Sequence, residues 1–214
     1  MYQRARSDEH KRERAAAFLD AARTVASRDG VHDATLVAIA QEAGLHHSAV
    51  RRYFPSRDAV LLRLAADGWA RWADRIAERL RDDPTASTDE IADTLVDTLV
   101  IDPLFCDLLG NVPLHLERGV DGTDLLDFKR EAIASLGRIV AAIAAASPKL
   151  GPTGARSLMT AANALAATLW QVCHPSPALA ALYEQEPELG HLAADFAPIL
   201  RRLLAATARG LAAG

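Results

Sequence analysis

Apolar positions recur with the spacing of amphipathic helices along the first part of the chain. Residues 9–28 carry an apolar stripe opposite arginine and aspartate, and Gly30 follows as a terminator. Residues 35–43 carry a shorter stripe, with Thr35 in the place of an N-cap and Gly44 directly after it. The pattern therefore predicts a long helix, a turn, and a short helix that ends at a glycine.

The next segment predicts a second short helix and then a long one. Residues 46–54 follow at once, and Pro55 closes this helix because the residue before a proline is driven away from helical geometry. Ser56 then caps a helix that we expect to run to about Leu80. Proline and glycine punctuate further apolar stripes, which predict helices at about 88–101, 103–117, 123–146, 154–173 and 190–212. The segment Pro175-Ser176-Pro177 is one of these breaks. No strand-like alternation of useful length appears, so the predicted fold class is all-α.

Composition adds an expectation about where the protein acts. Half of the 214 residues are hydrophobic and 24% are charged, which is typical of a globular chain. The opening segment MYQRARSDEHKRER has no apolar signal core, and no apolar run reaches the roughly 20 residues that span a bilayer. Cys106 and Cys173 form no CxxC pair and are expected to be free thiols. We expect a cytoplasmic protein with no membrane partner.

Charge is distributed unevenly along the chain. The net charge is -4, but residues 1–58 hold ten Lys and Arg against eight Asp and Glu, whereas the remainder holds fourteen against twenty. The first quarter is thus slightly cationic, which is compatible with nucleic-acid binding by that part. Because arginine is favoured throughout, the placement of individual arginines decides more than their number.

The residues around Gly44 have the spacing of a helix-turn-helix. Ala40 lets two helices cross closely, and Gly44 can adopt the positive φ of a sharp turn. Leu45 and Val50 then fill the angle between the helices, so that the second helix protrudes and its outer face suits a major groove. The polar side chains on that face are His46, His47, Ser48, Arg51 and Arg52. The alternative is a tight helical hairpin with a solvated cationic face.

The flanking sequence resembles a known family. The segment LVAIAQEAGLHHSAVRRYFPSRDAVL, within a match over about residues 9–64, resembles the TetR family of tetracycline-repressor-like regulators. Leu36 to Gly44 resembles the first helix of the family's helix-turn-helix, and residues 53–59 resemble its aromatic-Phe-x-Ser/Asn-Lys-Glu-Ala junction. The resemblance implies a three-helix DNA-binding head at residues 1–58 and a larger helical domain for ligand binding and dimerisation at residues 59–214.

The resemblance also implies contacts with a double-stranded DNA operator. Arg57 stands in the place of the family's usual lysine, where a cation and free backbone N–H groups at a helix start can hold a phosphate. The family commonly has Thr-Leu-Tyr and a polar residue at positions 49–52, so Arg51 takes over the phosphate or base contact. Arg52 reaches DNA or pairs with an acid on the first helix, and Tyr53 points its hydroxyl to phosphate or only packs in the core. The DNA-binding candidates are Thr35, His46, His47, Ser48, Arg51, Arg52, Tyr53 and Arg57.

An N-terminal arm is a further DNA-binding candidate. Arg4 and Arg6 belong to a cationic segment that could enter the minor groove or lie along the backbone. Asp8 and Glu9 dilute this charge, so a merely solvated segment is the alternative.

The last two long helices are the expected dimer interface, by implication from the resemblance. Both carry apolar stripes, and burial within one subunit is the alternative for them. Pro198 indicates that the last helix is kinked or starts later than residue 190. The candidates are Leu158, Ala162, Leu165, Leu169, Val172, Leu200, Leu203, Leu204, Thr207 and Leu211.

Large side chains in the second domain are candidates for a pocket that binds a small-molecule effector. For each aromatic residue, ordinary core packing is the alternative. Asn163 is more informative, because an amide in an alanine-rich helix needs a partner if it is buried, whether a ligand, the backbone or the other subunit. The candidates are Trp69, Trp72, Phe105, Leu109, His115, Asn163 and Trp170.

Catalysis has no positive support in the sequence. His115-x-Glu117, Cys173-His174 and Glu188-x-x-His191 do not build a metal site, because a di-iron bundle needs two Glu-x-x-His motifs and two further acids. We therefore expect no enzyme, no catalytic or metal-binding residues and no cofactor. The predicted function is a ligand-responsive repressor that binds a palindromic operator as a homodimer and is released by a small-molecule effector. A helical protein-interaction module that no longer binds specific DNA is the alternative.

Overall fold

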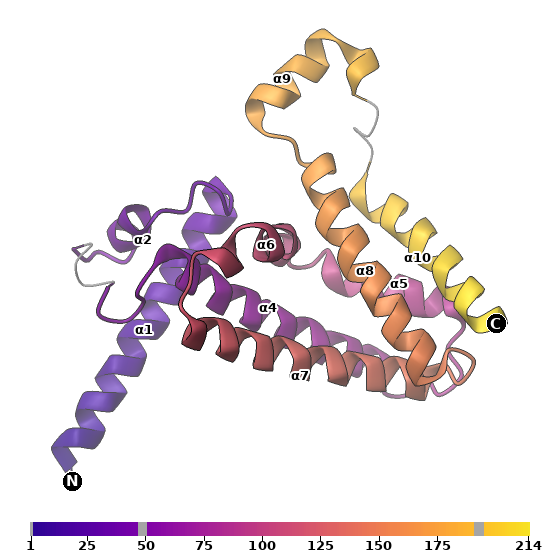
Figure 1. Ribbon diagram of the computed structural model, residues 1–214, viewed down its shortest axis with the longest axis horizontal. Coiled ribbons are helices and arrows are strands. Elements are labelled where there is room, and N and C mark those ends of the chain that lie inside the picture. Colours follow the sequence, from indigo (N-terminus) through magenta and orange to yellow (C-terminus); the bar gives the residue numbers. More distant parts are fainter. Residues whose placement is uncertain (1, 47–50, 191–194) are drawn as a thin grey trace.

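The computed structural model describes residues 2–46, 51–190 and 195–214, with side chains from residue 13 onward. Every regular element within these ranges is helical, so the predicted all-α class is confirmed (Figure 1). The head contains α1 (Tyr2–Asp29) and α2 (Leu36–Glu42). The larger domain contains α4 (Arg57–Leu80), α5 (Thr88–Leu99), α6 (Pro103–Leu114), the 3-10 helix η1 (Leu116–Arg118), α7 (Gly122–Ala146), α8 (Gly151–Cys173), α9 (Pro177–Gln185), the 3-10 helix η2 (Pro187–Leu189) and α10 (Phe196–Ala213).

The head is built on α1, which packs against α2 and the start of α4. Thr35 caps α2 as predicted, because its side chain accepts a hydrogen bond from the Ala38 N–H at 3.1 Å. Gly44 has a φ of +67°, the left-handed conformation that the sharp turn after α2 requires. Residues 47–50 of the second short helix, which was predicted over residues 46–54, lie outside the described residues, and residues 51–53 form a turn.

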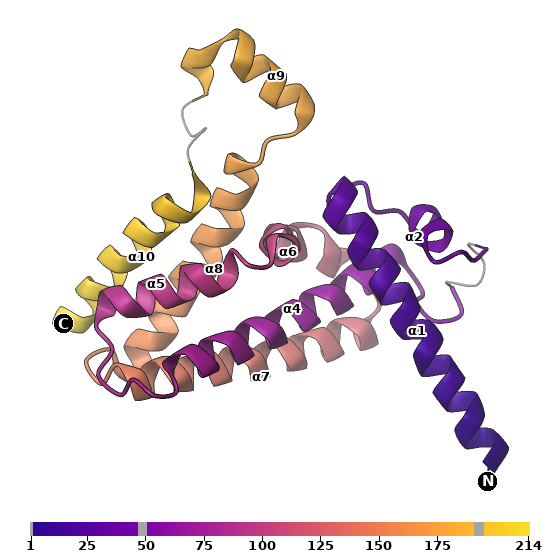
Figure 2. The ribbon, with the colours of Figure 1, turned by 180° about the vertical axis from the view of Figure 1, so that it is seen from behind.

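The larger domain is organised around two long helices, α4 and α7, that run side by side (Figures 1 and 2). Ser56 caps α4, and α4 ends at Leu80 as predicted. α8 packs on α6 and α7, and α10 packs on α5 and α8. α6 contacts α4 and α8 and also reaches α1, so it joins the body of the domain to the head.

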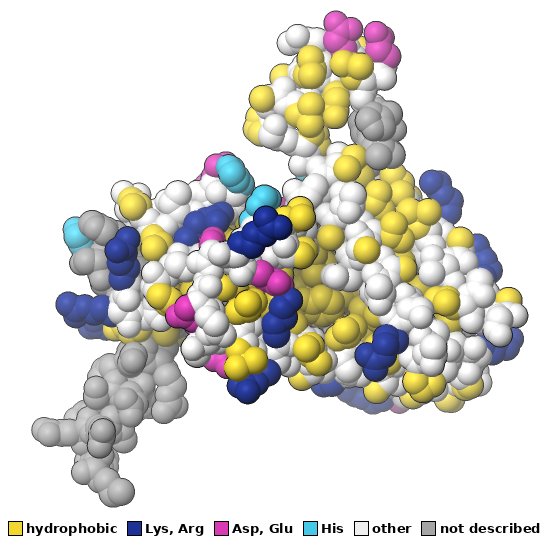
Figure 3. All heavy atoms as spheres, viewed as in Figure 1, with side chains coloured by type: hydrophobic (Ala, Val, Ile, Leu, Met, Phe, Trp, Pro, Cys, Tyr) yellow, Lys and Arg dark blue, Asp and Glu magenta, His cyan; other side chains and the backbone are white. Residues whose placement is uncertain are grey.

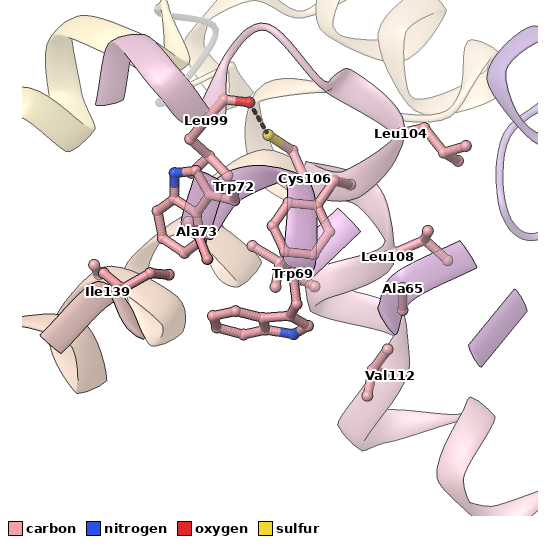
Figure 4. Packing of buried hydrophobic residues seen from close by; sticks show 14 of the residues in the cluster. Ala65, Trp69, Trp72, Ala73, Leu99, Leu104, Cys106, Leu108, Val112 and Ile139 are labelled. Atoms are coloured by element: carbon pink, nitrogen blue, oxygen red, sulfur yellow. Dashed lines mark hydrogen bonds between the residues drawn. The ribbon is translucent and has the colours of Figure 1, made fainter. Parts of the chain in front are cut away.

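Aromatic side chains of α4 and α6 form the centre of the core. Figure 4 shows Trp69 and Trp72 among buried side chains from α5, α6 and α7. The Trp72 Nε1–H donates a 3.0 Å hydrogen bond to Thr98, which satisfies the only polar atom of a buried indole. Phe105 lies directly on the backbone of α4, since a Cβ at Gly68 would be 2.2 Å from its Cδ2. Gly68 therefore allows α6 to pack this closely against α4.

The segment between α8 and α10 differs from the sequence prediction. Pro175-Ser176-Pro177 was interpreted as a break, but Ser176 caps α9 and Pro177 occupies its first turn, where a proline loses no hydrogen bond. α9 has no buried residue and projects away from the other helices (Figures 1 and 2). α10 begins at Phe196, later than residue 190, and Pro198 falls in its first turn. The later start that Pro198 indicated is thus what the structure contains.

Candidate DNA-binding head and ligand pocket

The described part of the helix-turn-helix agrees in part with the predicted packing. Ala40 is buried and the Leu45 N–H donates to its carbonyl, so the chain turns tightly after α2. Leu45 is nevertheless 39% exposed, and Val50, its expected companion in the angle between the helices, lies outside the described residues. His47 and Ser48 lie outside them as well.

The other candidates for DNA contact fall into two groups. Arg51 and Arg52 are exposed, and neither forms an ion pair with another described side chain. The alternative considered for Arg52, a pair with an acid on α1, is thus not seen among the described side chains. His46 is also exposed. Tyr53 is half-buried, and its ring lies 5.4 Å from that of Phe18, so it contributes to the small core of the head. Arg4 and Arg6 belong to α1, and their side chains lie outside the described part.

Arg57 has an internal structural role that the sequence did not indicate. Its Nε donates to the Ala34 carbonyl at 2.7 Å, and Nη2 donates to the carbonyls of Val31 and, at 3.1 Å, His32. Nη1 donates to Asp58 at 2.9 Å. These four hydrogen bonds engage most of the five N–H donors of the guanidinium, so few are left to bind a phosphate. Arg57 thus ties the start of α4 to the loop that leads into α2.

A pocket of about 230 Å³ lies between α4, α6, η1, α7 and α8. Three of the predicted pocket residues, Trp69, Leu109 and Asn163, line it. The other lining residues are Val112, Pro113, Glu117, Phe128, Lys129, Ala132, Ile133 and Leu136. The sequence did not single out these eight. Five of them lie on α7 and three on α6 and η1, and the apolar pattern of a helix gives no signal for which other helix each of its faces will meet.

Asn163 is the polar group inside this mainly apolar pocket. Its Oδ1 is buried and has no hydrogen-bond partner, and no hydrogen bond among the described residues engages its amide nitrogen. Leaving a buried acceptor unpaired costs about 1–3 kcal/mol. The amide of Asn163 therefore needs a hydrogen-bond partner that the described protein atoms do not provide.

Two opposite charges on the pocket wall neutralise each other. Lys129 Nζ lies 2.5 Å from Glu117 Oε1, and the other nine lining residues are uncharged. Glu117 is the less exposed partner, with 21% of its side chain accessible. The pocket as a whole carries no net charge.

The remaining pocket candidates lie elsewhere. Trp72 and Phe105 are 1% exposed and belong to the core, which was the alternative considered for them. His115 is exposed at the end of α6. Trp170 lines a second pocket of about 640 Å³ between the end of α8, α9 and the start of α10, where its ring stacks on His174 at 3.7 Å.

The predicted dimer residues fall into two groups according to how deeply they are buried in the protomer. Leu158, Ala162, Leu200 and Leu204 are at most 1% exposed, so they pack α8 against α10 in one subunit, as the alternative expected. The other six retain partial or full exposure: Leu165, Leu169, Val172, Leu203, Thr207 and Leu211.

The outer face of α8 is free of charge. The stretch from Ser157 to Val172 contains no charged residue, although Ser157, Thr160, Ala164 and Thr168 are exposed. Figure 3 shows a largely hydrophobic and uncharged surface over α8 and α10, with Lys and Arg at its margin. Depletion of charge on an exposed helical face is typical of a protein interface.

One element borders both the pocket and the head. α6 and η1 supply Leu109, Val112, Pro113 and Glu117 to the pocket wall. On the same helix, the carboxylate of Asp107 accepts a 3.0 Å hydrogen bond from the Val31 N–H in the loop before α2. A movement of α6 at the pocket would therefore move a group that holds the head.

The described residues contain no arrangement suited to metal or thiol chemistry. No group of three or more His, Cys, Asp or Glu side chains within the described ranges is placed to hold a metal ion. Burial raises the pKa of the Cys106 thiol to about 12, and its Sγ donates to the Leu99 carbonyl at 3.6 Å. Cys106 is therefore an unreactive core residue. Among the helices the structure describes, none has both the length and the apolarity needed to cross a bilayer.

A helix-turn-helix pattern in a small head, joined by one long helix to a larger helical domain with a pocket, is the architecture of a ligand-binding transcription regulator. Residues 18–64 match the family model "Bacterial regulatory proteins, tetR family", and residues 66–214 match "Tetracyclin repressor-like, C-terminal domain". The chain belongs to the TetR family of transcription regulators, as the resemblance implied.

Two solved structures share this fold. The crystal structure of multidrug binding protein EbrR complexed with imidazole is 21% identical, with a TM-score of 0.56, and the match covers 91% of this chain and 94% of that one. The fatty acid degradation regulator FadR from Bacillus halodurans is 16% identical, with a TM-score of 0.55, and the match covers 93% and 98%. At these identities the likeness concerns the fold alone. No curated protein sequence gives a significant match.

Proposed function

We propose that this TetR-family regulator is a homodimeric repressor that binds a near-palindromic operator and is released by a small molecule in the pocket between α4, α6, α7 and α8. Two heads related by a two-fold axis would place their recognition segments in successive major grooves. The exposed guanidinium groups of Arg51 and Arg52 suit bases or phosphates there.

The observation that carries this proposal is that α6 contacts both the pocket and the head. Its residues Leu109 and Val112 line the pocket, and its Asp107 holds the backbone of Val31 in the head. A ligand bound against Leu109 and Val112 would displace α6 and, with it, the loop before α2. Because coupling between two sites is reciprocal, ligand and operator should each weaken the binding of the other by a factor of roughly 5 to 150.

Dimerisation is proposed through the uncharged outer face of α8 and the neighbouring face of α10. The half-exposed residues Leu165 and Leu203 lie on these helices beside small exposed residues such as Ala164 and Ala206. Small side chains let helices of two subunits approach closely, and their burial removes apolar surface from water.

Small-molecule control is also supported by the structural neighbours. One is described as a multidrug binding protein in complex with imidazole, and the other as a regulator of fatty acid degradation. We infer for this chain only that its pocket also takes a small organic molecule.

Selection from random duplexes at near-physiological salt tests the proposal. We expect the purified protein to enrich an inverted repeat, and Arg51→Ala to weaken binding to it. If Arg51 reads a guanine, the loss should be about 1–3 kcal/mol and confined to one base pair in each half-site. Failure of the folded protein to enrich any sequence would overturn the repressor function and favour a helical interaction module.

A further inference from the structure

We propose that the pocket between α4, α6, α7 and α8 takes a neutral, compact molecule of one or two rings that donates a hydrogen bond to Asn163 Oδ1. This inference rests on the proposed function, because it names the class of effector that would control DNA binding. Three properties of the pocket lead to it: its size, the state of its amide and the balance of its charges.

The size of the pocket limits the ligand to a small molecule. Its volume is about 230 Å³. A dry apolar cavity of about 150 Å³ holds benzene, whereas pockets for drug-sized ligands range over about 300–1,000 Å³. The pocket is thus suited to one or two fused rings and is too small for a long acyl chain. Its wall agrees with this, since Trp69, Phe128 and Leu136 offer flat or branched apolar surface.

The amide of Asn163 defines the polar requirement. Its Oδ1 is buried and unpaired, and neighbouring positions of α8 that pack in the core are apolar, such as Met159 and Ala166. A leucine at this position would satisfy packing without leaving an acceptor unpaired. The amide is therefore best explained by a ligand, and an acceptor oxygen requires an O–H or N–H donor on that ligand.

The charges of the pocket exclude a strongly ionic ligand. Glu117 and Lys129 form a 2.5 Å ion pair, which uses the only two charged side chains among the lining residues. A cationic ligand would compete with Lys129 for Glu117, and an anionic one would compete with Glu117 for Lys129. A neutral molecule leaves the pair intact and pays no cost of desolvating a charge.

Indole and 1-methylindole form a matched pair of probes for this proposal. Both are neutral two-ring molecules, but only indole has an N–H donor. We expect calorimetric titration of the full-length protein, without DNA, to give at least tenfold tighter binding of indole than of 1-methylindole. Tryptamine, which adds an ammonium group to the same rings, should bind more weakly than indole.

Variants of Asn163 test whether its amide causes the preference for indole over 1-methylindole. Asn163→Leu should bring the ratio of the two affinities close to one and raise the melting temperature of the unliganded protein, with Asn163→Ala as a second variant if leucine does not fit. Thr153→Leu is the matched control, because Thr153 is exposed on α8 and does not line the pocket, so this variant should retain the preference for indole. An unchanged preference in both Asn163 variants, or no binding of indole at millimolar concentration, would overturn the proposal.

The operator measurement is kept separate, so that the two failures are distinguishable. If an operator is selected but neither probe binds, the ligand class is wrong and the repressor function stands. If indole binds with the expected preference and no operator is selected, the chemistry of the pocket stands and the repressor function is wrong.

Discussion

Asp107 on α6 accepts a 3.0 Å hydrogen bond from the backbone N–H of Val31, which lies 76 residues earlier in the chain. The other carboxylate oxygen accepts hydrogen bonds from Asn111 at 3.1 Å and from Gln171 on α8 at 2.8 Å. The carbonyl of Val31 accepts a hydrogen bond from the Arg57 guanidinium. The loop before α2 is thus held from α6 at its N–H and from α4 at its C=O.

Replacing Asp107 with asparagine should loosen this loop. The new amide N–H₂ faces either the Val31 N–H or the amides of Asn111 and Gln171, none of which can accept a hydrogen bond from it. At least one hydrogen bond to a charged group is therefore lost, which is worth about 1.5–3 kcal/mol. We expect faster hydrogen exchange in the peptide that contains Val31 and weaker operator binding. Asp127→Asn, at an exposed site on α7, is the control and should change neither. Unchanged exchange at Val31 would contradict a role for Asp107 in holding the head.

Arg57→Ala should destabilise the protein more than it alters the electrostatics of DNA binding. The substitution removes the hydrogen bonds to the carbonyls of Ala34, Val31 and His32. We expect the free energy of unfolding in urea to fall by about 1–3 kcal/mol. The slope of log K against log salt should stay nearly constant, since each lost phosphate contact would reduce it by about 0.9. A reduced slope with unchanged stability would instead assign Arg57 to a phosphate.

Ala164→Glu should prevent dimerisation without unfolding the protomer. Ala164 is exposed on the uncharged face of α8, where glutamate is a good helix former but brings a charge into an interface. Light scattering after size exclusion should give a mass near 23.0 kDa for the variant and twice this for the parent protein. The matched control is Ala141→Glu on the exposed side of α7, which should remain dimeric. A dimeric Ala164→Glu variant would place the interface elsewhere.

Gly68→Ala should destabilise the core through a direct clash. A Cβ at this position would lie 2.2 Å from Phe105 Cδ2, closer than any normal contact. Overpacking of this kind costs about 1–3 kcal/mol, although alanine has the better helix propensity. Phe105→Leu should recover part of the loss in the double variant, which calorimetric melting curves can measure. Equal destabilisation by Gly68→Ala in both backgrounds would show that the clash does not involve Phe105.

Elements with local signals could be predicted from the sequence. Thr35 and Ser56 are capping residues, and both cap the predicted helices, because a cap depends only on the next three residues. The same reasoning failed at Pro175-Ser176-Pro177, because proline and serine occur both in breaks between helices and at the start of a helix. α9 was missed because its apolar residues are exposed and give no stripe that faces a core.

The pocket was harder to predict than the helices. Trp69 and Trp72 are three residues apart on one helix, and one lines the pocket while the other is buried in the core. Periodicity identifies the inward side of a helix but does not say whether another helix covers it. Asn163 was found because an unpaired amide among alanines is a chemical signal that needs no tertiary information. The internal role of Arg57 was missed because its carbonyl partners lie 23 to 26 residues earlier.

The exposure of α9 has a practical consequence for following this protein in solution. None of its residues is buried, so a peptide inserted near Glu186, in the connection to η2, displaces no core side chain. This position should tolerate a fluorophore or an affinity tag better than the start of α4, where the larger domain joins the head. A dye attached there would report the tumbling and assembly of the intact molecule while leaving the surfaces that meet DNA unlabelled.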